Sequence, residues 1–246
     1  YPPKASVLGD AKVSLQKMID VADASTAGVR KSWVERAQSL VAEWRGDFES
    51  LLNSDAVPIR PERICNELSK NLPSDAMVLA DTGHSGMWMG GMFDLKHPGQ
   101  SYTRSFGHLG WAFSAGLGAK CALPDRPVLT FTGDSGFWYH IGEIETAVRW
   151  KINAVTLVNN NGAGNQSKRG FDAAYGGEQT EQAREMWVLN KVNFAQIAES
   201  MGAMGIRVEK PGELKGALQK AFEADRPVII DVVSDIEAMA PLPYAP

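Results

Sequence analysis

From residue 58 onward, short continuous apolar runs alternate with segments whose apolar residues recur at helical spacing. Runs rich in Val, Ile and Leu are typical of strands that are buried on both faces, as in parallel sheets. The runs predict strands over 76–81, 127–134, 154–160, 205–209 and 227–233, and the segments between them predict helices over 61–72, 141–150, 193–201 and 211–224. This alternation predicts an α/β fold with a doubly wound, mostly parallel sheet and helices on both faces.

Three further segments are rich in glycine and polar residues. Residues 82–93 are predicted to be a loop, and residues 104–124 a loop that leads into a helix of small residues, which Pro124 ends. Residues 162–186 hold five glycines and little apolar periodicity, so we expect an irregular stretch without structure of its own. Loops of this length are usually functional lids or disordered. We predict a lid that tightens when a ligand binds.

The first part of the chain does not share this alternation. Residues 4–22 predict the end of a strand, a turn and a helix, which is too little to fold alone. We therefore interpret residues 1–22 as the tail of an upstream middle domain. Residues 23–57 are predicted to be a helical linker, because residues 28–52 carry apolar side chains at helical spacing. The main domain is predicted to span residues 58–246.

Composition narrows the classes of partner. The 246 residues carry a formal net charge of -4, and the basic residues are scattered, so nothing indicates nucleic acid or an anionic membrane as a partner. No apolar run approaches the ~20 residues of a membrane helix, and no signal-peptide pattern is present. Cys65 and Cys121 lack metal-ligand spacing, which fits a reducing cytoplasm. Because the chain begins at Tyr1 without a methionine, we expect a fragment or a cleaved product.

Polar or glycine-rich residues follow three of the predicted strands, at 81–84, 133–136 and 159–161. Ligands of open parallel sheets bind beyond the carboxyl ends of the strands. Asp134 offers an anionic oxygen, and an asparagine and a backbone carbonyl offer neutral ones. Two phosphate oxygens and a water would complete the octahedron of Mg²⁺. The glycines let backbone N–H groups approach phosphates. The sequence therefore indicates a diphosphate held through a metal ion.

The spacing of these residues resembles a known fingerprint. Gly133-Asp134 stands 27 positions before Asn161, with a helix containing "GEIET" between them. This pattern resembles the thiamine diphosphate fingerprint of the acetolactate synthase, pyruvate oxidase and oxalyl-CoA decarboxylase group. "DTGHSGMW" resembles that family's diphosphate loop, and "GHLGWAFSAGLGAKCALPD" resembles the segment under the pyrimidine ring. The resemblance covers roughly residues 60–235, the cofactor-binding (PP) domain, and "VLGDAKVSLQKMI" resembles the end of the family's middle domain.

The resemblance implies thiamine diphosphate and Mg²⁺ as cofactors. It implies that Asp134, Asn161 and the carbonyl of Ala163 ligate the metal. The residues that it places at the diphosphate are Gly83, His84, Gly133, Ser135 and Gly136. It also implies that Leu109 supports the bent cofactor and that the Gly107 carbonyl accepts a hydrogen bond from the 4′-amino group. The protein would supply orientation and a dry site.

Several assignments stay open at this stage. Because three asparagines are consecutive, Asn159 or Asn160 could replace Asn161 as the metal ligand, although the spacing favours Asn161. His84 is either a diphosphate contact or proton donor, or a loop histidine bonded to backbone. His108 is either an acid–base group or a solvated residue that supports its neighbours.

The resemblance leaves two reactions open. The first is acetolactate synthase-like decarboxylation of a 2-oxo acid with transfer to an acceptor. The second, suggested by "GDSGF" with "EIET", is a lyase or decarboxylase reaction on oxalyl-CoA or a 2-hydroxyacyl-CoA. A third possibility is a cofactor-binding module without activity of its own.

The family takes a glutamate for the cofactor N1′ from a pyrimidine-binding (Pyr) domain, which no segment here resembles. We therefore expect a homodimer or homotetramer completed by a Pyr domain. The chain is then either the C-terminal part of a longer chain or one half of a split enzyme. A missing middle domain could carry FAD or ADP.

Two other enzyme classes fit the sequence poorly. "GHSGM" and "GDSGF" approach the nucleophile elbow G-x-S-x-G, but Met87 and Phe137 stand at the fifth position. A hydrolase of that fold also needs a late histidine, and the last one is His140. A dinucleotide fingerprint at Gly116 lacks its third glycine, since Cys121 occupies that place.

Overall fold

The computed structural model describes residues 2–22, 28 and 30–241. By its internal contacts the chain divides into two compact units, residues 1–48 and 49–246. The first unit contains helix α1 (Ala11–Asp20) and most of helix α2 (Lys31–Leu52). The carboxylate of Asp10 caps α1 by accepting a hydrogen bond from the backbone N–H of Val13 at 3.0 Å. Both helices confirm the sequence prediction.

The strand end predicted within residues 4–22 is wrong. The described residues ahead of α1 carry no strand assignment. An extended segment without a neighbouring strand leaves its backbone N–H and C=O groups to water, so it gains nothing from the extended conformation.

The second unit is built on a six-stranded sheet in the order β2-β1-β3-β4-β6-β5, in which every neighbouring pair is parallel. The strands are β1 (Met77–Ala80), β2 (Ser101–Arg104), β3 (Val128–Gly133), β4 (Val155–Asn160), β5 (Met204–Val208) and β6 (Val228–Val233). The predicted α/β fold with a parallel sheet is confirmed. The order reverses next to β1 and β3, which is where such sheets bind ligands.

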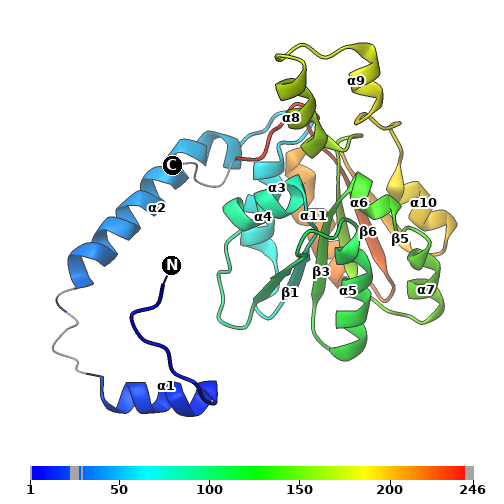
Figure 1. The fold of residues 1–246 in the computed structure, drawn as a ribbon. Coiled ribbons are helices and arrows are strands. Elements are labelled where there is room, and N and C mark those ends of the chain that lie inside the picture. The colour runs from blue at the N-terminus through cyan, green and yellow to red at the C-terminus, as the bar shows by residue number, and fades with distance from the viewer. Residues whose placement is uncertain (1, 23–27, 29, 242–246) are drawn as a thin grey trace. The chain divides into compact units, whose positions relative to one another are not determined.

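Helices cover both faces of this sheet (Figure 1). Helices α3 (Pro61–Asn71), α4 (His84–Met92) and α11 (Leu214–Glu223) pack together on one face. The other face carries α5 (Trp111–Ala122), α6 (Asp134–Trp138), α7 (Glu143–Arg149) and α10 (Phe194–Ser200). Helices α8 (Asn165–Ala174) and α9 (Glu181–Glu185) follow β4, and a short 3₁₀ helix (Pro211–Glu213) precedes α11.

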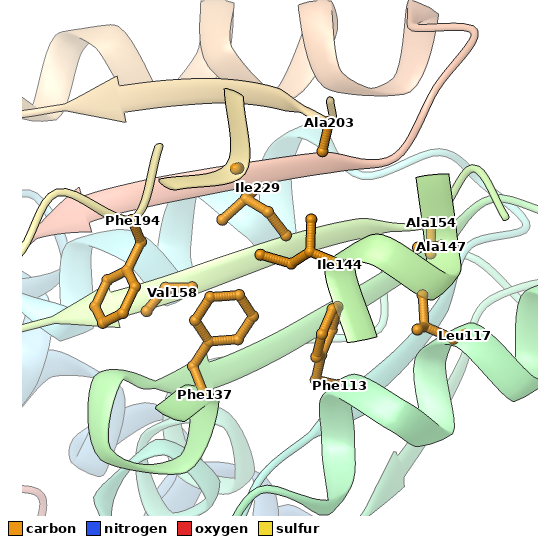
Figure 2. Packing of buried hydrophobic residues seen from close by; sticks show 11 residues of the cluster. Phe113, Leu117, Phe137, Ile144, Ala147, Ala154, Val158, Phe194, Ala203 and Ile229 are labelled. Atoms are coloured by element: carbon orange, nitrogen blue, oxygen red, sulfur yellow. The ribbon is translucent and has the colours of Figure 1, made fainter. Parts of the chain in front are cut away.

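An aromatic cluster holds α6 against the sheet (Figure 2). The ring of Phe137 is fully buried and meets Phe113 edge-on at 5.0 Å and Phe194 at 5.4 Å between centroids. Val158 of β4 and Ile229 of β6 complete the contact from the sheet. Such edge-to-face pairs add to the stabilisation from burial. Because α6 begins at Asp134, this core fixes the position of the predicted metal ligand.

Residues 82–93 are not the predicted loop, because His84–Met92 within them form helix α4. One of its glycines is required by close packing. A Cβ on Gly86 would lie 2.5 Å from the Asp81 carbonyl oxygen and 2.6 Å from Nε of Arg104. The prediction of a loop was wrong because a glycine such as Gly86 can serve close approach of neighbouring strand ends as well as a turn.

The irregular stretch predicted for residues 162–186 is also wrong, because α8 and α9 lie within it. Helix α8 is held by hydrogen bonds to residues far along the chain. The side-chain amide of Asn165 donates to the carbonyls of Ile236 and Ala238 at 2.8 and 2.9 Å. Beside α9, the indole of Trp187 donates to Gln179 at 2.7 Å. Periodicity within the segment cannot reveal the partners of Asn165, which lie 71 and 73 positions away.

Candidate functional site

Three loops meet at the carboxyl ends of β1, β3 and β4 and line a cavity of about 140 Å³. The structure brings most of the predicted residues to it, namely Gly83, His84, Leu109, Gly133, Asp134, Ser135, Gly136, Asn161 and Ala163. Gln166 and Ser167 of α8 line it as well. A larger cavity, of about 500 Å³, is lined by Val128 and Val155, which begin β3 and β4, and by none of the predicted residues. The chemistry indicated by the sequence therefore gathers at one place.

Asp134 is the buried anion of this cavity. Its side chain is 3% exposed. One carboxylate oxygen accepts the N–H of Ser135 at 2.6 Å, and the other accepts the N–H groups of Gly162 at 2.6 Å and Ala163 at 3.0 Å. Burial raises the pKa of Asp134 to about 6, although these N–H groups lower it. No lysine or arginine among the described residues forms an ion pair with it. A desolvated carboxylate of this kind favours a bound cation.

The three consecutive asparagines have different surroundings. The amide of Asn160 lies on the far side of β4, where it donates to the Val192 carbonyl at 2.9 Å and to Asp231 at 2.8 Å. Asn159 and Asn161 line the cavity. The alternation of side chains along a strand causes this split. Of the three candidates that the sequence left open, Asn160 is therefore engaged away from the cavity.

Asp231 fixes Asn160 and was not recognised as part of the site from the sequence. It is fully buried and also accepts the N–H of Phe194 at 2.8 Å and the guanidinium of Arg207 at 2.5 Å. The sequence does contain a feature that could have identified Asp231, because this residue interrupts the apolar run of β6. A charge in such a run must be paired with other groups.

Asp81 is a second residue whose role the sequence did not reveal. It is fully buried, and both carboxylate oxygens lie 3.0 Å from the N–H of Gly110. The same carboxylate accepts the Thr132 hydroxyl at 2.9 Å and the N–H of Thr82 at 2.8 Å. Burial raises the pKa of Asp81. Asp81 thus connects the loop after β1 and strand β3 to the loop before α5.

His84 begins α4 and is 7% exposed. Burial, and to a smaller extent the positive charge of Arg169, lower the pKa of His84 to about 4. The imidazole is therefore neutral near pH 7. Its ring lies edge-on to Trp88, one helical turn later, with 5.3 Å between centroids. A neutral imidazole can donate or accept a hydrogen bond in the cavity without adding charge.

Four buried polar atoms in the lining have no hydrogen-bond partner among the described residues. They are Nδ1 of His84, Nε1 of Trp88, Oδ1 of Asn159 and Oδ1 of Asn165. Each unpaired buried group of this kind costs about 1–3 kcal/mol. Their gathering in one cavity indicates that a polar ligand completes them. One carboxylate, amide oxygens and glycine N–H groups form a donor set that fits Mg²⁺ with a diphosphate.

Two predicted residues lie outside the lining. Gly107, with a φ of 86°, and His108 belong to the loop before α5. The backbone of His108 donates to the Ser105 hydroxyl at 3.0 Å and its carbonyl accepts from the same hydroxyl at 2.7 Å. The His108 side chain is exposed. This bond pair shapes the loop that presents Leu109 to the cavity.

Comparison with protein families identifies the same region. The family described as "Thiamine pyrophosphate enzyme, C-terminal TPP binding domain" matches residues 81–232. The chain is 29% identical over 236 residues to a probable acetolactate synthase of Mycobacterium bovis, covering 95% of this chain and 41% of that protein. It is 30% identical over 241 residues to a 2-hydroxyacyl-CoA lyase of Arabidopsis thaliana, covering 95% and 42%.

A solved structure is also similar. It is the thiamine diphosphate-dependent 4-hydroxybenzoylformate decarboxylase of Rhodococcus jostii RHA1, with a TM-score of 0.64 and 27% identity. The similarity covers 74% of this chain and 34% of that one. The chain thus spans about two fifths of the length of the curated relatives above. Among the residues that the structure describes, no helix has the length and hydropathy of a membrane span.

Proposed function

We propose that this chain, which belongs to the thiamine pyrophosphate enzymes through their C-terminal TPP-binding domain, provides the diphosphate and metal half of a thiamine-dependent active site. The observation that carries this proposal is the buried Asp134 carboxylate. Three backbone N–H groups hold it at the cavity, and no described side chain neutralises it. The cavity of about 140 Å³ is smaller than usual ligand pockets of about 300–1,000 Å³. It suits part of a ligand.

In this proposal Asp134, Asn161 and the carbonyl of Ala163 hold Mg²⁺. The residues that hold the diphosphate are Gly83, His84, Gly133, Ser135 and Gly136. Leu109 supports the cofactor at the mouth, and the Gly107 carbonyl receives its amino group. When bound, thiamine diphosphate would stabilise the negative charge left on a carbonyl carbon when a C–C bond breaks. The chain's own residues would bind and orient the cofactor and keep water out of the site.

The reaction that we propose is acetolactate synthase-like cleavage and formation of C–C bonds on 2-oxo acids. Relatives named acetolactate synthase support it. A specific observation favours a second candidate, a thiamine-dependent lyase or decarboxylase acting on an acyl-CoA. The relative at 30% identity is named 2-hydroxyacyl-CoA lyase, and Ser135 follows Asp134 as in oxalyl-CoA decarboxylase-like members. Assays with pyruvate, oxalyl-CoA and a 2-hydroxyacyl-CoA side by side separate the two. Turnover of the CoA substrates alone would overturn the first choice.

The proposal extends to partners. A Pyr domain supplies the glutamate for N1′, either from another part of a longer chain or from a separate subunit, and the active unit is a homodimer or homotetramer. His84 and His108 remain candidates for proton transfer, and FAD or ADP remains a candidate ligand of a middle domain. The cytoplasmic location expected from the spacing of the two cysteines belongs to the same proposal.

Calorimetry tests the proposal. Thiamine diphosphate is titrated into the enzyme assembled with its Pyr domain, with and without Mg²⁺. Asp134→Ala should abolish the Mg²⁺-dependent binding, because it removes the anionic ligand. Asp225→Ala is the matched control, since Asp225 is largely exposed and forms an ion pair with its neighbour Arg226. Undiminished binding by Asp134→Ala would refute the metal assignment.

A further inference from the structure

Asn159 lines the cavity, but the proposed function gives it no role. It lies near the end of β4, in register with Gly133 of β3, and its side chain is 3% exposed. It lines the cavity together with Asp134 and Asn161. The two asparagines that follow it have hydrogen bonds. Asn160 binds Asp231, and Asn161 accepts the N–H of Ala163 at 3.1 Å.

The Asn159 amide is unfavourable for the fold alone. Its Oδ1 is buried and has no partner among the described residues. The residues before it in β4 are Val155, Thr156, Leu157 and Val158, all buried. An apolar side chain of similar size would continue this strand and would leave no acceptor unpaired. A residue that breaks a local rule in this way is expected at a functional site.

The chemistry of the cavity limits what can satisfy this oxygen. An amide oxygen needs a hydrogen-bond donor, whereas ionised diphosphate oxygens only accept. Mg²⁺ in proteins usually keeps several waters, whose protons are donors. The proposed ligand set already takes its amide oxygen from Asn161, so a metal-bound water is the donor that the proposed metal offers to Asn159 Oδ1.

We propose that Asn159 Oδ1 accepts a hydrogen bond from a water bound to the metal, and that Asn159 thereby strengthens metal binding at the expense of the stability of the ligand-free fold. This inference rests on the proposed function. Asn159 acts through the water and is therefore a positioning residue. Outer partners of this kind typically change metal affinity about 10- to 100-fold.

The test compares Asn159→Leu with the parent protein in two measurements. At saturating thiamine diphosphate, the dissociation constant for Mg²⁺ should rise about 10- to 100-fold. Without ligands, the Tm should rise by about 2–4 °C, because an unpaired buried amide is removed. A role in the fold alone predicts a lower Tm, so the second measurement separates the two explanations. Asn159→Asp keeps an acceptor at this point and should recover the Mg²⁺ affinity.

Asn153→Leu is the matched control. Asn153 precedes the other end of β4, and its Oδ1 also has no partner among the described residues. The Mg²⁺ affinity of the Asn153→Leu variant should equal that of the parent protein.

If the parent protein shows no Mg²⁺-dependent binding of thiamine diphosphate, the proposed function fails. If the parent binds and Asn159→Leu binds equally well, or is less stable than the parent, this inference is overturned. Should Asn159→Leu not fold, Asn159→Ala makes the same comparison of affinities, and equal Mg²⁺ affinity there overturns the inference as well.

Discussion

Two neighbouring groups of the cavity should make opposite contributions to stability as the pH changes. Burial raises the pKa of Asp134 from 3.8 to about 6. Burial and the charge of Arg169 lower the pKa of His84 from 6.5 to about 4. The folded chain without metal therefore favours a protonated Asp134 and a neutral His84. Substituting either residue should therefore reveal how the other makes the free energy of unfolding depend on pH.

The signs follow from proton linkage. A raised carboxyl pKa gives stability that is fully present below the unfolded value of 3.8 and is lost as the pH rises through about 6. A lowered imidazole pKa gives stability that is present above 6.5 and is lost as the pH falls through about 4. At about 1.4 kcal/mol per unit, each amounts to about 3 kcal/mol. Over this window the two contributions nearly cancel in the parent protein.

Asp134→Asn removes the contribution of the Asp134 carboxyl while keeping the shape of the side chain. Relative to the parent, its free energy of unfolding should increase by about 3 kcal/mol between pH about 4 and pH about 7. His84→Gln should show the opposite trend, a relative decrease of similar size. Differences between variant and parent cancel the titration of all other carboxylates.

Urea unfolding in the presence of a chelator measures these free energies at intervals of pH. Curves for Asp134→Asn and the parent that run parallel from pH about 4 to about 7 would refute the argument that burial without a counter-charge controls this carboxyl. Adding Mg²⁺ and thiamine diphosphate gives a second check. The cation binds only the ionised carboxylate, so its stabilising effect on the parent should weaken below pH about 6.

Three further outcomes are expected. Asp231→Ala should destabilise the chain by about 2–5 kcal/mol in thermal unfolding, because it removes the buried acceptor of the Asn160 amide, the Phe194 N–H and the partly exposed Arg207 guanidinium, whereas the exposed Asp225→Ala should cost under about 0.5 kcal/mol. Gly136→Ala should weaken binding of thiamine diphosphate, since its Cβ would lie 2.8 Å from an Asp81 oxygen, and Gly142→Ala, with open space, should not. Hydrogen exchange across residues 162–186 should slow on binding of thiamine diphosphate and Mg²⁺, and equal exchange in both states would contradict the predicted lid.

The sheet was largely predictable because its strands bury both faces. Continuous apolar runs such as residues 228–230 leave few alternatives to a buried parallel strand. Strand β2 escaped prediction because Ser101–Arg104 is polar and half exposed. It is an edge strand, held by its parallel pairing with β1, and such pairing leaves no pattern in its own sequence.

The site was predictable where function depends on the order of residues along the chain. Asp134 and Asn161 stand at strand ends that a parallel sheet must bring to one edge, and they line one cavity. The contacts of Asp81 and Asp231 were not predictable in the same way. Asp81 binds the N–H of Gly110, 29 positions away, and Asp231 binds Asn160, 71 positions away. Only the packed fold brings such partners together.

The run of three asparagines shows what the structure adds to the spacing. A strand directs successive side chains to opposite faces, so Asn159 and Asn161 reach the cavity while Asn160 reaches Asp231. Asn160 therefore connects the cavity to the network of Arg207 and β6. Its loss should disturb Asn159 and Asn161 together, because both flank it on the same backbone. One residue type thus serves the proposed metal, its water and the scaffold, because the pleat of β4 turns Asn159 and Asn160 to opposite sides and Asn161 follows directly after the strand.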